Sequence, residues 1–309
     1  MSTALITHLA CLNHDTGPYH PECPDRLRRV LAALEAEDFA ALIREQAPLA
    51  TEEQLARVHP LDYVQAILAI RPAEGESLQL DADTLMSAGS AEAAQRSAGG
   101  AVLAVDAVME GWARTAFVAT RPPGHHAEAA RAMGFCLFAN AAVAARHAQA
   151  RWGLTRVAVL DFDVHHGNGT QAIFERDATL FYGSSHQFPC YPGTGDQAER
   201  GVGNVVNVPL PPGSGSVAFR AAWELILLPA LDVFAPELVI VSAGFDAHKA
   251  DPLAQLRVET ADFAWLTAQL LEAARRHAGG RLVSLLEGGY DLDALAASAA
   301  AHVRTLLTH

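Results

Sequence analysis

The stretch VLDFDVHHGNGT, residues 159–170, joins an apolar run to two aspartates and two histidines. In an extended chain the side chains at i, i+2 and i+4 share a face, so Asp161, Asp163 and His165 point one way and His166 points away. Uninterrupted apolar runs are typical of strands buried on both sides in a parallel sheet. The stretch therefore predicts a buried strand with reactive side chains at its carboxyl end.

Three other apolar runs end in the same way: TAFVAT leads into RPPGHH, LVIV into SAGFD, and RLVSLL into EGGY. Further strands are predicted at 3–10, 179–185 and 204–210. Helices are predicted at 25–46 with Asp25 as the N-cap, and at 59–68, 90–111, 140–152, 168–176, 217–234, 260–278 and 291–307. This alternation predicts an α/β fold with a mostly parallel central sheet flanked by helices, whose carboxyl edge holds the site.

The composition favours one large domain. Half of the 309 residues are hydrophobic, and no linker or repeat divides the chain, so we expect a single domain over residues 1–309. The net charge of −13 argues against nucleic acid as a partner. This acidity either favours a cationic substrate or only keeps the protein soluble, and both interpretations stay open.

The cysteines and the first residues suggest where the protein works. Cys11, Cys23, Cys136 and Cys190 form no C-x-x-C pair or disulfide pattern. The N-terminal residues show no basic targeting pattern, and no apolar run reaches the length of a membrane helix. We therefore expect a cytoplasmic protein with no membrane partner.

Asp163 and His165 have the spacing of metal ligands, and Asp246 after another strand is the natural third. Two carboxylates and one imidazole with an open fourth position suit a catalytic zinc, although the oxygen-rich set leaves Fe(II), Co(II) or Mn(II) open. The alternative for each residue is an ordinary polar strand end. Asp161 lies deeper in the apolar run and needs a partner such as a histidine N–H or a cation.

RPPGHH and LEGGY add groups that can move protons. His125 and His126 are adjacent, so only an irregular loop can bring both to one site. With His125 backed by Asp161, and His126 by Asn168, the pair would be differently tuned bases. Tyr290 could donate to a developing oxyanion. The alternatives are two surface histidines and an amphipathic tyrosine at the start of the last helix.

Taken together, these residues resemble the zinc-dependent histone deacetylase family, including its bacterial histone deacetylase-like and acetylpolyamine amidohydrolases. The resemblance covers some nine-tenths of the chain. It runs from HPECPDR to LLEGGY and rests on seven motifs in the family's order: RPPGHHA, MGFCLFAN, DFDVHHGNGTQ, YPGTGD, NVPLPPG, SAGFDAH and LEGGY. It implies the single-domain arginase/deacetylase fold and a metal-dependent amidohydrolase.

The resemblance also implies a role for each matching position. The metal ligands would be Asp163, His165 and Asp246, and the catalytic groups His125, His126 and Tyr290. Asp161 and Ser184 would belong to a structural potassium site, and Arg26 to a route for released acetate. The walls of an acyl-lysine tunnel would be Gly134, Phe135, Tyr191 and, at a rim position, Leu253.

Two departures from the family's patterns sharpen this expectation. Position 168 is Asn where some relatives have Asp, which points to the class II-like branch and leaves His126 without a charged partner. Related binuclear manganese ureohydrolases need carboxylates near positions 167 and 244, which are Gly167 and Gly244 here. We therefore expect one catalytic metal and no guanidine hydrolysis.

The expected reaction is removal of an acetyl or related acyl group from an Nε-acyl-lysine peptide or protein. An acetylpolyamine is the alternative substrate. Leu253 mildly favours lysine, because polyamine-preferring relatives present an acidic residue near the rim, although Glu22 or Glu259 could supply that charge. A catalytically idle binder of metal or acyl-amine is a remote alternative. The acyl length, the physiological metal and homo-oligomer formation stay open.

Overall fold

The computed structural model describes residues 2–309. Its strands are β1 (Thr3–Thr7), β2 (Ile43–Gln46), β3 (Leu78–Asp81), β4 (Thr84–Met86), β5 (Thr115–Val118), β6 (Val157–Asp161), β7 (Leu180–Gln187), β8 (Val205–Leu210), β9 (Leu238–Ala243) and β10 (Leu282–Leu286). Its helices are α1 (Pro24–Ala33), α2 (Glu52–Ala56), α3 (Leu61–Ala69), α4 (Ser90–Glu110), α5 (Asn140–Trp152), α6 (Asn168–Phe174), α7 (Ser216–Ala222), α8 (Leu228–Phe234), α9 (Thr260–His277) and α10 (Leu292–Thr308).

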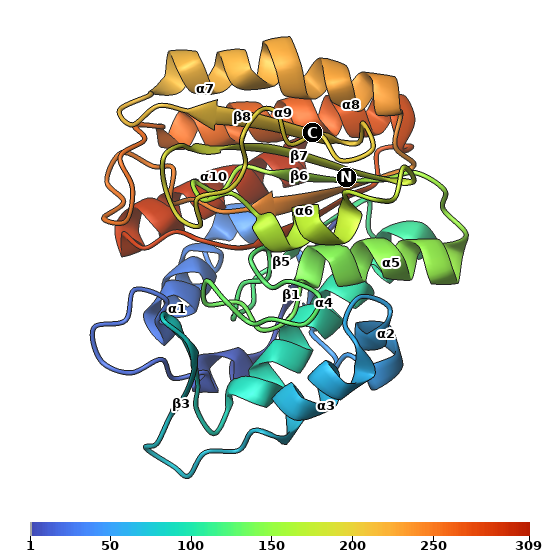
Figure 1. Cartoon of the computed structure of the whole chain (residues 1–309). Coiled ribbons are helices and arrows are strands. Elements are labelled where there is room, and N and C mark those ends of the chain that lie inside the picture. Colours follow the sequence, from blue (N-terminus) through green and yellow to red (C-terminus); the bar gives the residue numbers. More distant parts are fainter. Residues whose placement is uncertain (1) are drawn as a thin grey trace.

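Eight strands form one sheet in the order β2-β1-β5-β10-β9-β6-β7-β8, and every neighbouring pair is parallel (Figure 1). The strands β5, β6, β9 and β10 are buried along their whole length, as uninterrupted apolar runs predict. The predicted α/β fold with helices flanking a parallel sheet is therefore confirmed.

Helices cover both faces of this sheet (Figure 1). One face packs against α1, α7, α8, α9 and α10, and includes Phe117, Leu160 and Val241. The other face packs against α4 and α5, and includes Val118, Val159 and Ile240. Alternate residues of the same strands thus enter two different cores, which makes the sheet a rigid base for whatever follows its strands.

The helices follow local signals. Gly111 and Gly153 end α4 and α5 in the left-handed conformation, with φ values of 84° and 69°. The Asp291 side chain caps α10 by accepting the backbone N–H of Ala294. The helix predicted at 217–234 is present as α7 and α8 joined by a π-helical turn at 223–227. Pro229, the second residue of α8, lacks an N–H for the helical ladder.

The helix predicted over 25–46 is wrong in its second half. The helix α1 ends at Ala33, and Ile43–Gln46 form the edge strand β2, paired in parallel with β1. Only Ile43 in β2 is partly shielded from solvent, and the sequence of this strand shows no alternating apolar pattern that would predict it. Pairing of β2 with β1 outweighs the helical propensity of these residues. Cys23, not Asp25, is the N-cap of α1, and Pro24 occupies its first turn.

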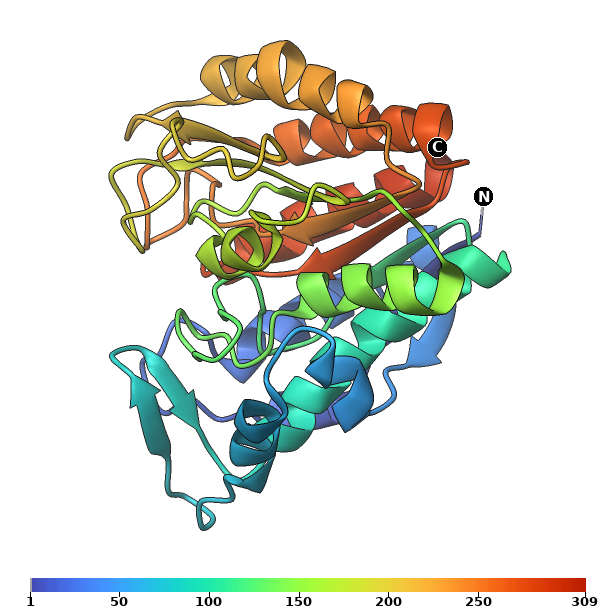
Figure 2. The same cartoon turned by 45° about the vertical axis from the view of Figure 1, so that its right-hand side comes forward.

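The hairpin of β3 and β4 and the short helix α2 were not predicted. The hairpin pairs in antiparallel fashion and extends from the body of the molecule (Figure 2). Asp83 in its turn and Thr84 at the start of β4 accept hydrogen bonds from the Gly134 and Phe135 amides, respectively, in the loop after β5. This unpredicted element therefore reaches the edge of the sheet where the site is expected.

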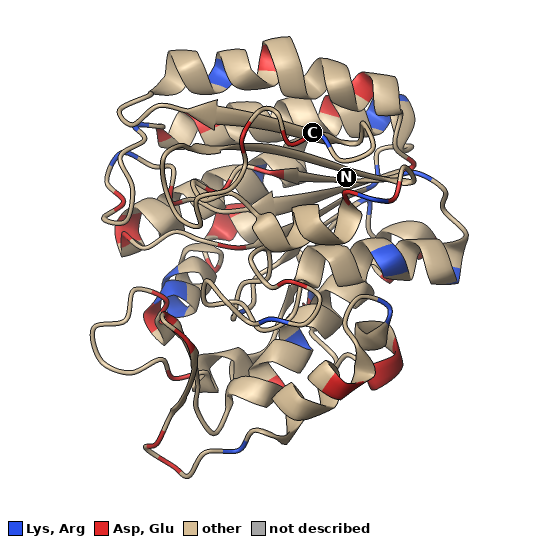
Figure 3. Cartoon of the chain, viewed as in Figure 1, with Lys and Arg blue, Asp and Glu red and all other residues tan. Residues whose placement is uncertain are grey.

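Lysine and arginine residues are scattered along the ribbon among aspartate and glutamate residues (Figure 3). In residues 2–309, no helix combines the length and the apolar character that crossing a bilayer requires.

Candidate active site

Four strand ends meet at one edge of the sheet. The strands β5, β10, β9 and β6 are consecutive neighbours and all parallel, so the segments that follow them leave from the same edge. These segments carry His125 and His126, Tyr290, Asp246, and Asp163 with His165, respectively. The structure thus brings together side chains that lie up to 165 positions apart in the chain.

Asp163, His165 and Asp246 offer ligand atoms that all lie within 4.8 Å of one another. His165 Nδ1 is 3.1 Å from both Asp163 Oδ1 and Asp246 Oδ2. Backbone amides orient the carboxylates: Gly288 N–H donates to Asp163 and Val164 N–H donates to Asp246. The donor set would fit one divalent ion, because two carboxylates and one imidazole converge from fixed positions.

Two buried carboxylates this close repel each other. Burial and the charge of Asp163 raise the pKa of Asp246 to about 7. Burial would also raise the pKa of Asp163, but His125 and the hydrogen bond from His165 outweigh it and lower that pKa. Burial would lower the pKa of His165, but its hydrogen bonds to Asp163 and Asp246 raise it well above the usual value. A bound dication would relieve the repulsion between the Asp163 and Asp246 carboxylates, which the raised pKa of Asp246 reflects.

Glycines surround the three ligands and leave no room for more carboxylates. A Cβ at Gly244 would overlap Asp163, and one at Gly288 would overlap Asp246. A Cβ at Gly167 would overlap Asp161 and would lie 2.6 Å from the Tyr182 hydroxyl. Side chains at 167 and 244 are therefore excluded by packing, which fits a site for one metal.

The tandem histidines lie on an irregular loop between β5 and α5, and their ring centroids are 3.9 Å apart. His125 Nδ1 is 3.0 Å from Asp161 Oδ2, and its Nε2 is 3.8 Å from Asp163. His126 Nδ1 is 2.9 Å from the side-chain oxygen of Asn168. The Nδ1 proton of His126 must point at that oxygen, so its Nε2 is left as an acceptor.

The surroundings tune the two histidines in opposite directions. Burial would lower the pKa of His125, but the charges of Asp163 and Asp161 outweigh it and raise that pKa to about 10. Burial and the charges of His125 and His165 lower the pKa of His126 well below its usual value. The surroundings therefore favour the protonated form of His125 and the neutral form of His126.

A pocket of about 220 Å³ leads from the surface to these groups. Leu253 and Tyr191, each more than a third exposed, stand at its mouth, and the buried His126 and His165 lie at its floor. Gly134, Phe135, Tyr290 and Asp83 complete the lining. All four residues predicted as tunnel walls thus line one pocket, together with an aspartate that was not predicted.

Tyr290 lies half-buried beside Phe135, with their rings 5.9 Å apart, and Arg26 stacks over the tyrosine ring at 4.9 Å. Burial raises the pKa of Tyr290 well above its usual value, so the phenol keeps its proton. The Arg26 guanidinium is buried and donates to Gly289 O, Glu287 O and Glu22. The structure thus places Arg26 behind Tyr290, and its part in an acetate route stays a prediction.

Asp161, Ser184 and His166 all have protein partners. Asp161 also accepts hydrogen bonds from the Tyr182 hydroxyl and from the Asp163 amide. Ser184 Oγ lies 2.9 Å from His186 Nδ1, and His166 contacts Thr194 and Gln171 through its two ring nitrogens. None of these three side chains has an unpaired acceptor atom that would indicate a bound potassium ion. The potassium site therefore stays a prediction.

Sequence reasoning missed two carboxylates. Asp83, in the turn of the β3–β4 hairpin, lines the pocket, and DAD in a polar stretch gave no sign of that position. Glu287 is buried behind the loop that carries the histidines and accepts hydrogen bonds from the Gly124 and His125 amides. Its position directly after an apolar strand, in LEGGY, was the available signal.

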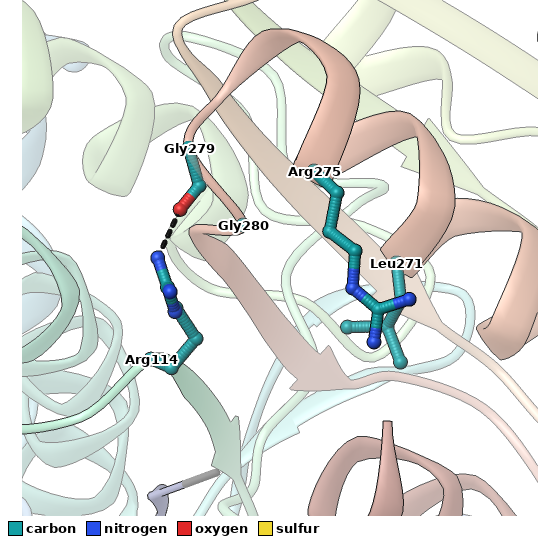
Figure 4. A pocket seen from close by; sticks show the side chains of 5 residues that line it. All are labelled: Arg114, Leu271, Arg275, Gly279 and Gly280. Atoms are coloured by element: carbon teal, nitrogen blue, oxygen red, sulfur yellow. Dashed lines mark hydrogen bonds between the residues drawn. The ribbon is translucent and has the colours of Figure 1, made fainter.

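A second hollow, of about 260 Å³, lies at the opposite edge of the sheet, before the first residues of β5 and β10 (Figure 4). Arg114, Leu271, Arg275, Gly279 and Gly280 line it, and Arg114 donates to Gly279 O. This lining offers neither a metal ligand nor a proton acceptor. The chemistry therefore belongs to the carboxyl edge.

The sequence matches a family model described as the histone deacetylase domain over residues 20–306. The chain is 45% identical to the histone deacetylase-like amidohydrolase of Pseudomonas aeruginosa, covering 93% of this chain and 81% of that protein. It is 35% identical to a probable deacetylase of Archaeoglobus fulgidus, covering 95% and 82%, respectively. The crystal structure of the HDA15 HD domain superposes with a TM-score of 0.94 at 38% identity, over 99% of this chain and 88% of that one.

Proposed function

Because the chain belongs to the histone deacetylase family, we propose that it is a zinc-dependent deacetylase acting on Nε-acyl-lysine side chains or similar acylated amines. Family membership supports a hydrolase with deacetylase activity. The observation that carries the finer proposal is the convergence of Asp163 and Asp246 on His165, which lines the pocket together with His126 and Tyr290.

The three ligand side chains would hold the metal, which supplies Lewis acidity toward a carbonyl group and a water molecule. Their two negative charges neutralise a dication more completely than three neutral histidines would. The metal alone would therefore activate the substrate less, and the protein's own acid, base and hydrogen-bond donor must contribute more.

His126 acts as the base. It is neutral at physiological pH, and Asn168 holds its Nδ1 proton, so Nε2 on the pocket floor can take a proton from the attacking water. The carboxylates of Asp163 and Asp161 favour the protonated form of His125. In that form, its charge disfavours protonation of His126 and would stabilise negative charge that develops on the substrate.

Tyr290 donates its phenol proton in a hydrogen bond to the oxygen that becomes negative as water adds to the amide carbon. Burial keeps that phenol protonated, and Arg26 behind the ring holds its position. The C–N bond then breaks, the amine nitrogen takes the proton held by the histidine pair, and the products are acetate and a free amine.

The shape of the pocket favours a single extended alkyl chain, because Phe135 and Tyr191 stand on its walls. Leu253 makes one side of the mouth apolar, as a lysine side chain requires. Glu22 cannot supply charge there, since it is fully buried between Arg26 and Arg121. Glu259 is occupied by Lys249 and by the first turn of α9.

The direct test is release of acetate from an acetyl-lysine peptide by the zinc-reconstituted protein. We expect multiple turnovers that a chelator abolishes and zinc restores. Stoichiometric zinc binding without release of acetate, from either a peptide or an acetylpolyamine, would instead indicate the idle binding protein.

One observation favours the second candidate, an acetylpolyamine deacetylase: Asp83 places a carboxylate in the pocket lining. Asp83→Asn keeps an oxygen for the Gly134 amide but removes the charge. If a distal ammonium binds there, kcat/KM for an acetylpolyamine should fall by about five- to tenfold, with a smaller change for a neutral acetyl-lysine peptide. Equal changes for both substrates would remove this support.

A further inference from the structure

The segment Leu286–Tyr290, LEGGY, contacts each part of the site, although the proposed mechanism uses only Tyr290. The amide of Gly288 fixes the ligand Asp163, and the carbonyl oxygens of Glu287 and Gly289 fix Arg26 behind Tyr290. The Glu287 side chain points to the histidine loop instead of the pocket, whose lining does not include it. It is 1% exposed.

The Glu287 carboxylate receives three hydrogen bonds. Its Oε2 accepts the backbone N–H of Gly124 at 2.6 Å and of His125 at 3.2 Å, and its Oε1 accepts the Ser242 hydroxyl at 3.0 Å. A buried carboxylate is costly unless such donors compensate it. No lysine or arginine forms an ion pair with Glu287 in the described residues, and the hydrogen bonds from the Gly124 and His125 amides offset part of the cost of its burial.

The backbone around His125 has no strand or helix to hold it. Its carbonyl oxygen accepts the amides of Gly169 and Thr170 at the start of α6, and its own amide has Glu287 as its partner. Gly124 packs closely against the start of α5, where an added Cβ would lie 2.6 Å from Asn140 N. The peptide that carries His125 is thus fixed on one side by α6 and on the other by Glu287.

We propose that Glu287 is a positioning residue that clamps the Gly124–His125 backbone, so that the His125 ring stays between Asp161 and Asp163 beside His126. This inference rests on the proposed function. It adds a residue that acts through the histidines and does not touch the substrate. The same short segment would then set the oxyanion donor and the histidine pair in one rigid arrangement, as precise placement of reacting groups requires.

The matched variants are Glu287→Gln and Glu287→Ala. Gln can direct its oxygen at both amides and its NH₂ at Ser242, so it keeps the clamp without the charge. With zinc-reconstituted protein we expect Glu287→Gln to keep kcat within about threefold. Glu287→Ala should lower kcat by about 10- to 100-fold, with zinc content unchanged and KM changed less than kcat. Ser242→Ala removes only the hydrogen bond from the Ser242 hydroxyl to Glu287, so it should lower kcat less than Glu287→Ala does.

Amide hydrogen exchange of the peptide spanning residues 121–127 gives a second readout that needs no activity. Exchange at Gly124 and His125 should accelerate in Glu287→Ala and stay slow in Glu287→Gln. Should Glu287→Ala fail to fold, Glu287→Asp replaces it, because the shorter side chain loses its reach. The same two expectations then apply.

The proposal is overturned if Gln is as defective as Ala, or if exchange and kcat do not change together. Its failure is distinguishable from failure of the proposed function. A wild-type protein that releases no acetate removes the deacetylase assignment, whereas the exchange measurement still shows whether Glu287 clamps the loop.

Discussion

The two edges of the same sheet both carry a hollow of similar size, yet they differ in chemistry. At the carboxyl edge the groups are buried and depend on one another: Asp163, His165 and Asp246 meet within 4.8 Å. At the amino edge, Arg114 and Arg275 are exposed, and Arg114 is bonded to the Gly279 carbonyl (Figure 4). The size of a hollow therefore says little about function.

This difference follows from burial. A charge in water interacts weakly with its neighbours, whereas buried charges shift one another's protonation strongly. The opposite pKa shifts of His125 and His126, only 3.9 Å apart, are an example. Substitutions at the two edges should therefore have effects of very different size.

The largest effect is expected for Asp246→Asn, which removes one of the two ligand carboxylates. Stoichiometric zinc and deacetylase activity should both fall to background, measured by metal analysis and acetate release. Asp38→Asn, at an exposed aspartate that pairs with Arg304, is the control and should keep both. Full zinc content and activity in Asp246→Asn would place the metal elsewhere.

Tyr290→Phe removes a hydrogen-bond donor but no ligand. We expect kcat to fall by ~10²–10³ with zinc content unchanged, because the oxyanion loses one donor. Tyr63→Phe removes a hydroxyl that donates to Leu137 O and does not line the pocket, so it should leave kcat unchanged. Near-full activity of Tyr290→Phe would remove the role assigned to this tyrosine.

Glu22→Gln tests the buried ion pairs behind the site. Burial opposes ionisation of Glu22, but Arg121 and Arg26 outweigh it and lower its pKa to about 2 from 4.5. The stabilisation is therefore fully present above pH 4.5 and is lost as the pH falls toward 2. The variant should lose about 3 kcal/mol of unfolding free energy at pH 7, and its difference from wild type should shrink below pH 4.5.

Urea unfolding across this pH range measures the effect, with the exposed Glu45→Gln as the control. A difference that stays constant between pH 7 and pH 2 would show that the stabilisation does not come from the charge of Glu22.

The smallest effect is expected at the amino edge. Arg114→Ala removes an exposed side chain and one hydrogen bond to Gly279, so the unfolding free energy should change by no more than about 0.5 kcal/mol. The kcat/KM for the acetyl-lysine peptide should be unchanged. A loss of activity in Arg114→Ala would mean that the two edges of the sheet are coupled, and that the amino edge is not independent of the site.

Much of the architecture was predictable because it is encoded locally. The strands of the central sheet that matter for the site, β5, β6, β9 and β10, are uninterrupted apolar runs followed by polar residues. The residues that meet around Asp163, His165 and Asp246 could be named because parallel strands end at one edge.

Other features left no local signal. The strand β2 has one shielded residue and exists through pairing with β1, so its sequence resembled a continuing helix. Asp83 lies in a polar turn like any other, and only the packing of the β3–β4 hairpin against Gly134 and Phe135 brings it to the pocket. Glu287 carried only a weak signal, a glutamate directly after an apolar strand.

The sequence by itself determined the α/β class and the candidate ligands, histidines and tyrosine, since periodicity and residue chemistry are local properties. Only the tertiary structure decided which carboxylates face the pocket, which lie behind it, and which histidine is held neutral. Those properties depend on burial and on distances between residues far apart in the chain. Asp83 lies in the pocket lining and Glu287 behind the histidine loop because the sheet, the hairpin and the loops pack as they do.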